Sequence, residues 1–211
     1  SHEVVRGAER SAVAAGQEHT VVLKSDGSVH TVGGNAHGQL GDSTQHSKNS
    51  FVQVWQSTDE GRAIASGWEH SVILSGNGQV LTTGRNNRGQ LGRGQHNTDK
   101  YDFATAWTVT DGVVSSIGAG SEHTVIVKSD GEVWAVGYNH VGQLGDGTKV
   151  DKSTFVRVIQ NGGVATDAGV EHTVILKNDG SVWTAGLNKH GELGDGTKNN
   201  KLVFVQVVAT G

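Results

Sequence analysis

The stretch EHTVIVKSDGEVWAVGYNHVGQLGDGT, residues 122–148, contains the pattern from which the fold can be predicted. It holds an alternating apolar run, an Asp-Gly pair, a second apolar run and a loop punctuated by glycine. Alternation of apolar and polar residues is typical of a half-buried strand, and an Asp-Gly pair between two such runs indicates a hairpin. The stretch therefore predicts two antiparallel strands followed by a loop.

Near copies of this stretch begin at Glu18, Glu69 and Glu171. The histidines that follow the glutamates stand at positions 19, 70, 123 and 172, so their spacings are 51, 53 and 49 residues. A period near 50 with four strands is the size of one β-propeller blade. We therefore predict an all-β, propeller-type domain over residues 1–211, with four antiparallel blades over approximately 11–61, 62–112, 113–162 and 163–211.

Four strands are predicted in each repeat. The first is a run of small residues ending in glycine, and the second begins at the histidine of Glu-His. The predicted first strands are 11–16, 62–67, 115–120 and 165–169; the third strands are 28–33, 79–84, 132–137 and 181–186; the outer strands are 51–55, 104–109, 155–159 and 204–208. Between the second and third strands, Asp26-Gly27 and its three counterparts predict type I′ turns, which need a positive φ at both central residues.

Composition excludes several classes of function. Without cysteine the chain has no disulfide, thiolate metal site or cysteine nucleophile. The formal charge of −4, with both signs interspersed, supplies no basic surface for nucleic acid or an anionic membrane. No apolar run approaches the roughly 18 residues of a membrane span, so we expect a soluble protein whose compartment the sequence leaves open.

The His-Thr, Asp-Gly-x-Val-Trp, Gly-x-Asn and Gly-Gln-Leu-Gly motifs resemble those of the regulator of chromosome condensation repeat family. The resemblance covers roughly residues 11–208. It implies a propeller, mostly of seven blades, in a family that includes a nucleotide exchange factor, a plant ultraviolet photoreceptor, ubiquitin-ligase accessory domains and β-lactamase inhibitors. A light-sensing tryptophan cluster is not expected, because Gln17, Ser121 and Val170 stand where the second repeat has Trp68.

Four repeats leave three arrangements open. The chain is a part of a larger propeller, an open arc that pairs with another chain, or a closed four-bladed ring. An open arc exposes two apolar blade faces, which favours association. We therefore favour a homodimer that completes a ring over closure as four blades.

The repeated Glu-His pair is the most prominent candidate for chemistry, because histidine and carboxylate together suit a divalent metal. Recurrence in every repeat favours a structural role for His19, His70, His123 and His172. The loop aspartates Asp42, Asp146 and Asp195 lack the dense oxygen spacing of a calcium loop, which predicts turn hydrogen bonding. No catalytic set stands out from the repeats, so we predict no catalytic residues, no metal, no cofactor and no enzyme.

The residues that differ between the copies are the remaining candidates for function. They lie in loops, where binding residues concentrate, and they include aromatic and arginine side chains of the kind that dominate protein interfaces. The predicted binding residues are Trp68, Arg85, Arg88, Tyr138, His140 and Lys189. We predict a non-catalytic scaffold for a protein partner; the alternative is a carbohydrate or small-ligand binder, with a metal enzyme or GTPase exchange factor less favoured.

Overall fold

The computed structural model describes residues 11–56 and 60–209, which form four sheets of four antiparallel strands. Within each sheet the strands lie in sequence order. Blade 1 is β1 (Ala12–Ala15), β2 (His19–Leu23), β3 (Val29–Gly33) and β4 (Lys48–Trp55); blade 2 is β5 (Gly61–Ser66), β6 (His70–Ser75), β7 (Val80–Gly84) and β8 (Lys100–Trp107); blade 3 is β9 (Val114–Ala119), β10 (His123–Lys128), β11 (Val133–Gly137) and β12 (Lys152–Ile159); blade 4 is β13 (Gly163–Ala168), β14 (His172–Lys177), β15 (Val182–Gly186) and β16 (Lys201–Val208). These sheets confirm the predicted all-β class and blade size. Among the described residues, no helix is long and apolar enough to cross a membrane.

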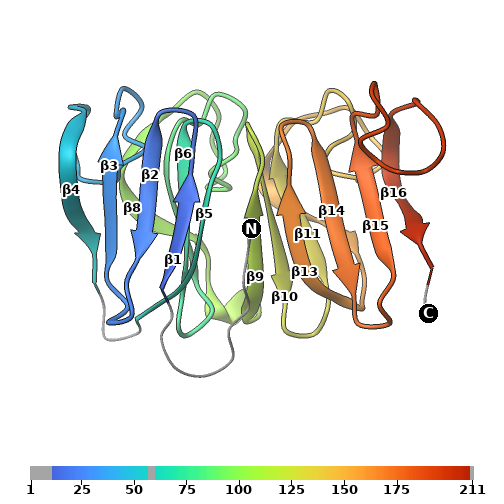
Figure 1. The fold of residues 1–211 in the computed structure, drawn as a ribbon, viewed down its shortest axis with the longest axis horizontal. Helices are drawn as coiled ribbons and strands as arrows, with labels where there is room; N and C mark the ends of the chain where they lie inside the picture. Colours follow the sequence, from blue (N-terminus) through green and yellow to red (C-terminus); the bar gives the residue numbers. More distant parts are fainter. Residues whose placement is uncertain (1–10, 57–59, 210–211) are drawn as a thin grey trace.

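The blades are arranged as an open arc. Their first strands β1, β5, β9 and β13 pack on one another in that order. The outer strands of the two end blades, β4 and β16, lie at opposite ends of the molecule, with parts of blades 2 and 3 behind (Figure 1). The described residues therefore form part of a propeller and not the closed four-bladed ring that was one of the three arrangements.

Apolar side chains fill the three interfaces between consecutive blades. Three clusters form the core, and the middle one includes Val72, Leu74 and Trp107 of blade 2 with Ile117 and Ile126 of blade 3. Burial is lost where a neighbour is missing. Leu176 of blade 4 is 40% exposed, whereas its equivalents Leu23, Leu74 and Val127 are at most 1% exposed. The core therefore belongs to the interfaces, and each end blade leaves one apolar face uncovered.

The predicted hairpins between second and third strands are present, but the predicted turn type is wrong. Gly27 has a φ of 76°, whereas Asp26 is not among the described non-glycine residues with positive φ. The Gly27 N–H donates to the Lys24 carbonyl at 3.0 Å, which closes a turn over residues 24–27 with glycine as its last residue. This is the three-residue loop of a type I turn followed by a left-handed glycine. The Asp26 carboxylate accepts the Ser28 N–H at 3.0 Å, which holds this conformation.

The outer strands begin three or four residues before their predicted starts. Each begins at a lysine, and three of these lysines pair with the loop aspartate of the same blade: Lys48 with Asp42, Lys152 with Asp146 and Lys201 with Asp195, at 3.1–3.3 Å. Because the first residues of these strands are polar, they show no apolar alternation, and the sequence pattern predicts a loop there. The predicted strand end at Val109 is also wrong, because this residue lies in a short 3-10 turn, Val109–Asp111.

Candidate functional site

A buried histidine of each of the first three blades bonds to a hydroxyl of the next blade. The His70 Nε2 atom lies 3.0 Å from Thr124 Oγ1, and that hydroxyl donates to the Gln90 carbonyl at 2.8 Å. Since the hydroxyl proton is already used, Thr124 Oγ1 must accept, so His70 Nε2 carries the proton. The other two interfaces repeat the chain of bonds: His19, Ser71 and the Gln39 carbonyl, and His123, Thr173 and the Gln143 carbonyl. We call this arrangement the histidine bridge.

The histidine bridge requires neutral imidazoles. Burial lowers the pKa of His19 to about 4 and the pKa values of His70 and His123 to about 3. The Nδ1 atoms of these three rings are buried without a hydrogen-bond partner, as expected for the unprotonated nitrogen of this tautomer. Within residues 11–56 and 60–209, no three His, Asp or Glu side chains are placed to hold a metal ion. The geometry assigns these histidines to joining blades.

The glycine that ends each first strand makes room for the bridge. A Cβ atom on Gly120 would lie 2.1 Å from His123 Cε1 and 2.5 Å from the Gly169 carbonyl oxygen of the next blade. A Cβ atom on Gly16 or Gly67 would likewise meet the histidine ring of its own blade and a glycine carbonyl oxygen of the next blade. The small-residue first strand is therefore a packing requirement of the histidine beside it.

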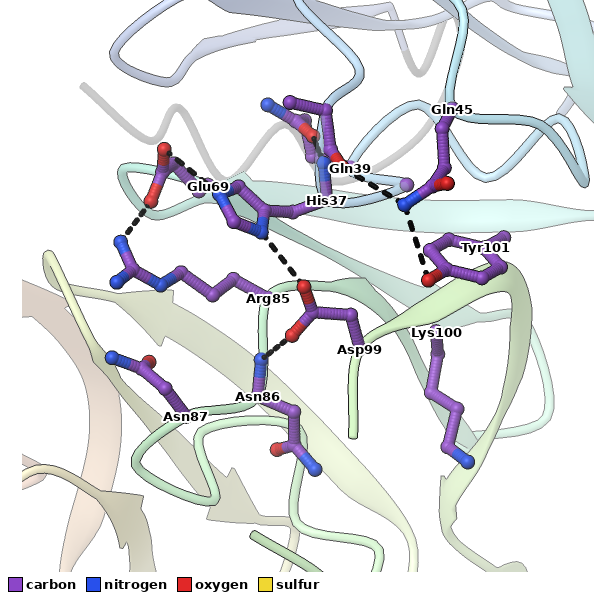
Figure 2. Close-up of polar contacts among 12 residues, drawn as sticks. His37, Gln39, Gln45, Glu69, Arg85, Asn86, Asn87, Asp99, Lys100 and Tyr101 are labelled. Carbon is purple, nitrogen blue, oxygen red and sulfur yellow. Dashed lines mark hydrogen bonds and ion pairs between the residues drawn. The ribbon is translucent and has the colours of Figure 1, made fainter. Parts of the chain in front are cut away.

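The turns that follow the first strands and the loops that follow the third strands lie at the same end of every blade, which we call the loop face. It is at the top of Figure 1. At the first interface, His37 of blade 1 lies between two carboxylates of blade 2 (Figure 2). His37 Nδ1 is 2.7 Å from Asp99 and Nε2 is 3.5 Å from Glu69. Glu69 also pairs with Arg85, so the predicted binding residue Arg85 is engaged within its own blade.

The second interface carries the most elaborate cluster of the loop face. Arg88 takes the place of His37, with Glu122 at 3.8 Å and Asp151 at 3.5 Å. Its guanidinium carbon lies 4.4 Å from the centre of the Tyr138 ring. His140 stacks on the same tyrosine with ring centres 4.6 Å apart. Three predicted binding residues from two blades, Arg88, Tyr138 and His140, thus form one cluster.

The remaining predicted residues lie apart from this cluster. Trp68 is 44% exposed and borders a hollow of about 300 Å³ at the inner edge of the arc, lined by the strand ends and turns of all four blades. Lys189 is exposed on blade 4. Sequence reasoning missed His37, Asp99, Glu122 and Asp151. Their only signal is the register of the loops, since these ion-pair partners are 34 to 63 residues apart in sequence.

The loop aspartates accept hydrogen bonds within their own loops, as predicted. Asp195 accepts the Thr197 N–H and hydroxyl and the Asn188 amide, and these bonds, the Thr197 hydroxyl foremost, hold its pKa well below the usual range. Asn188 in turn accepts the Leu193 N–H at 3.0 Å. This fully buried asparagine recurs as Asn35, Asn86 and Asn139 and organises each loop from within.

Comparison with known proteins agrees with this architecture. A family model for the regulator of chromosome condensation (RCC1) repeat matches residues 11–39, 62–90, 114–143 and 164–192. The chain therefore belongs to the regulator of chromosome condensation repeat family. The curated relatives include the ultraviolet-B receptor UVR8 of Arabidopsis thaliana, 31% identical over 69% of this chain, and the human probable E3 ubiquitin-protein ligase HERC3, 34% identical over 70%.

Solved structures share the fold at low sequence identity. Yeast Prp20, solved with Kap60, matches 98% of this chain with a TM-score of 0.82 and 19% identity, and human WBSCR16 matches 94% with a TM-score of 0.80 and 19% identity. This chain spans 50% and 52% of those two chains, and 33% and 14% of UVR8 and HERC3. The solved structures show the same propeller fold, and the chain spans about half the length of the two proteins compared.

The histidine bridge predicts a pH-dependent stability. Because the pKa values of His19, His70 and His123 are below their unfolded value near 6.5, the unfolded chain binds more protons below that pH. The contribution of these neutral histidines to the free energy of unfolding is complete above about pH 7. It decreases as the pH is lowered, by up to about 4 kcal/mol per pH unit for the three histidines well below pH 6. Urea unfolding between pH 5 and 7 measures this slope. His70→Gln is expected to reduce it by about a third and His96→Gln, at an exposed site, to leave it unchanged; a flat profile contradicts the bridge.

Removing a single bridging hydroxyl tests the geometry directly. Thr124→Val keeps the shape of the side chain and leaves two buried groups, the His70 Nε2–H and the Gln90 carbonyl, without this partner. Each unpaired buried group costs about 1–3 kcal/mol, so the free energy of unfolding should fall by about 2–6 kcal/mol. The same replacement at exposed Thr154 of β12 is the matched control, expected to change stability by less than about 0.5 kcal/mol. Equal effects at the two sites would refute the assignment.

Proposed function

We propose that the chain is a non-catalytic propeller module that binds a protein partner through its loop face and associates with a second copy through its end faces. One observation supports binding through the loop face. Within this chain the blade interfaces repeat the same contacts, whereas the residues of the loop face differ from blade to blade. The histidine bridge recurs at all three interfaces, whereas the loop face carries His37 at one interface and the Arg88–Tyr138–His140 cluster at the next.

The chemistry of the loop face suits a protein. Arg88 holds its guanidinium against an aromatic ring and near two carboxylates, which limits the rotamer entropy lost when a partner binds. Trp68 adds a large exposed aromatic surface on the same face. Aromatic and arginine anchors of this kind dominate binding energy at protein interfaces. Relatives support the class of partner, since yeast Prp20 is bound to Kap60 in one structure and binds Gsp1p and histones.

The hollow beside Trp68 supports a second candidate, a small polar ligand such as a sugar. Its wall is mostly glycine, alanine and serine, with Gln17, Trp68 and Val170 as the larger side chains. Sugars bind where an aromatic ring meets polar groups. The hollow is lined by turns of all four blades at the inner edge of the arc, so its final shape depends on how the arc is completed.

Replacing two aromatic anchors distinguishes these candidates. Trp68→Ala with Tyr138→Ala should reduce the protein captured from a source extract at least tenfold, because each anchor contributes about 2 kcal/mol or more at a typical interface centre. Val109→Ala with Val113→Ala removes two exposed apolar side chains near the opposite end and should leave capture unchanged. Quantitative mass spectrometry of the captured proteins gives the measurement. Undiminished capture by the aromatic double variant, or specific binding on a glycan array with no captured protein, would contradict a protein-binding loop face.

A further inference from the structure

The two end faces of the arc carry the two halves of one blade interface. At every internal interface the earlier blade supplies a histidine Nε2–H and a glutamine carbonyl, and the later blade supplies a hydroxyl. Blade 4 presents the first half, His172 with the Glu192 carbonyl, and blade 1 presents the hydroxyl of Thr20. Among the described residues none of these three atoms has a hydrogen-bond partner. The unused half at one end is complementary to the unused half at the other.

A main-chain ladder along the inner edge is interrupted in the same way. The Gln17 N–H donates to the Trp68 carbonyl, the Trp68 N–H to Ser121 and the Ser121 N–H to Val170, at 3.0–3.2 Å. The next bond in this series would join the Val170 N–H to the residue equivalent to Gln17 in a following blade. Within the part that the structure describes, the Val170 N–H and the Gln17 carbonyl are left as a free donor and a free acceptor.

Apolar contacts follow the same repeat. The phenylalanine of each later outer strand packs on the glycine of the preceding Gly-Gln-Leu-Gly loop, as Phe103 does on Gly41, Phe155 on Gly92 and Phe204 on Gly145. Phe51 of blade 1 is 53% exposed, and a Cβ on Gly194 of blade 4 would meet no atom within 4 Å. Val13 of blade 1 is 74% exposed, whereas its equivalents Ile64 and Ile117 are buried, and Leu176 is uncovered on blade 4.

Charged groups of the loop face are also complementary between the two end faces. His37 and Arg88 of earlier blades lie near the Glu-His glutamates of later blades, Glu69 and Glu122. Blade 4 carries His190 at this position with Lys189 before it, and blade 1 carries Glu18. All three side chains are exposed. Lys189, on an edge that also carries the Glu192 carboxylate, therefore offers a cation at one end where Glu18 offers an anion at the other.

We propose that blade 4 of one copy docks on blade 1 of a second copy in the register of the internal interfaces, so that His172 donates to the partner's Thr20 and Thr20 donates to the Glu192 carbonyl. The occupant is a second copy because this chain itself carries the complementary hydrogen-bond, apolar and charged groups. The end blades lie at opposite ends of the arc (Figure 1), so two copies form two such interfaces and close a ring of eight blades, a number propellers adopt. This inference rests on the proposed self-association and specifies its register.

Cysteine pairs test the register, since the chain has no native cysteine. Gln17→Cys with Val170→Cys should give a disulfide-linked dimer on a non-reducing gel, and either single variant should not. Ser121→Cys with Val170→Cys is the matched internal pair, whose main chains bond at 3.2 Å, and it should crosslink within one chain. Crosslinking of the internal pair alone would overturn the register. A dimer by light scattering that lacks the Gln17–Val170 crosslink would retain self-association but refute this interface.

Light scattering of surface variants provides a second readout. The unmodified chain should have twice the 22.0 kDa mass of one chain. Phe51→Asp should halve the mass, because in the proposed dimer it places a charge against the backbone at Gly194 of the second copy. Val203→Asp, at an exposed outer-strand site where blade 2 carries Asp102, should leave it unchanged. A mass of 22.0 kDa for the unmodified chain would overturn the proposal and assign the end faces to further blades of a longer polypeptide or to another protein.

Discussion

A neutral histidine joins consecutive blades at each of the three internal interfaces, and the repeat is built around it. Its ring is buried between two sheets, where an unpaired polar group costs free energy, so Nε2–H needs an acceptor. The acceptor is a hydroxyl whose own proton goes to a main-chain carbonyl of the histidine's blade. This arrangement explains three features of the repeat together: histidine at the start of the second strand, serine or threonine after it, and glycine at the end of the first strand.

The same constraint separates the fixed parts of the chain from the variable ones. The bridge and the Phe-Gly contact hold consecutive blades in one relative position, and the buried asparagine holds the loop within each blade. The residues of the loop face can differ without loss of the fold, and they do differ between the blades of this chain. His37 between two carboxylates and Arg88 against Tyr138 occupy equivalent sites with different chemistry. A rigid set of interfaces thus supports a face whose residues are free to match a partner.

Sequence alone predicts the parts of this fold that repeat locally. The strand pairs, hairpin positions and blade size follow from apolar alternation and the spacing of His19, His70, His123 and His172. The turn type was wrong because Asp-Gly also suits a type I turn in which only the glycine has positive φ. The outer strands were placed too late because their first residues, such as Lys48, are polar and pair with a loop aspartate.

The site was predictable only as a list of candidates. Arg88, Tyr138 and His140 stand out by differing from their copies, but their mutual contact depends on how two blades pack. The partners of His37 were missed for the same reason, since Asp99 lies 62 residues further along the chain. Contacts that cross a blade interface have no local sequence pattern. Once one interface is known, however, the repeat predicts the geometry of the other two internal interfaces.

Nitrogen NMR of the histidine side chains measures the bridge itself. If the hydroxyl proton is used by the glutamine carbonyl, His19, His70 and His123 must be neutral with the proton on Nε2 at pH 7, and they must stay neutral at pH 5. Long-range proton–nitrogen correlation spectra distinguish the two tautomers and the charged ring. Three rings with a protonated Nε2 and a bare Nδ1 are expected at both pH values. Protonated Nδ1 in these rings, or their charging by pH 5, would contradict it.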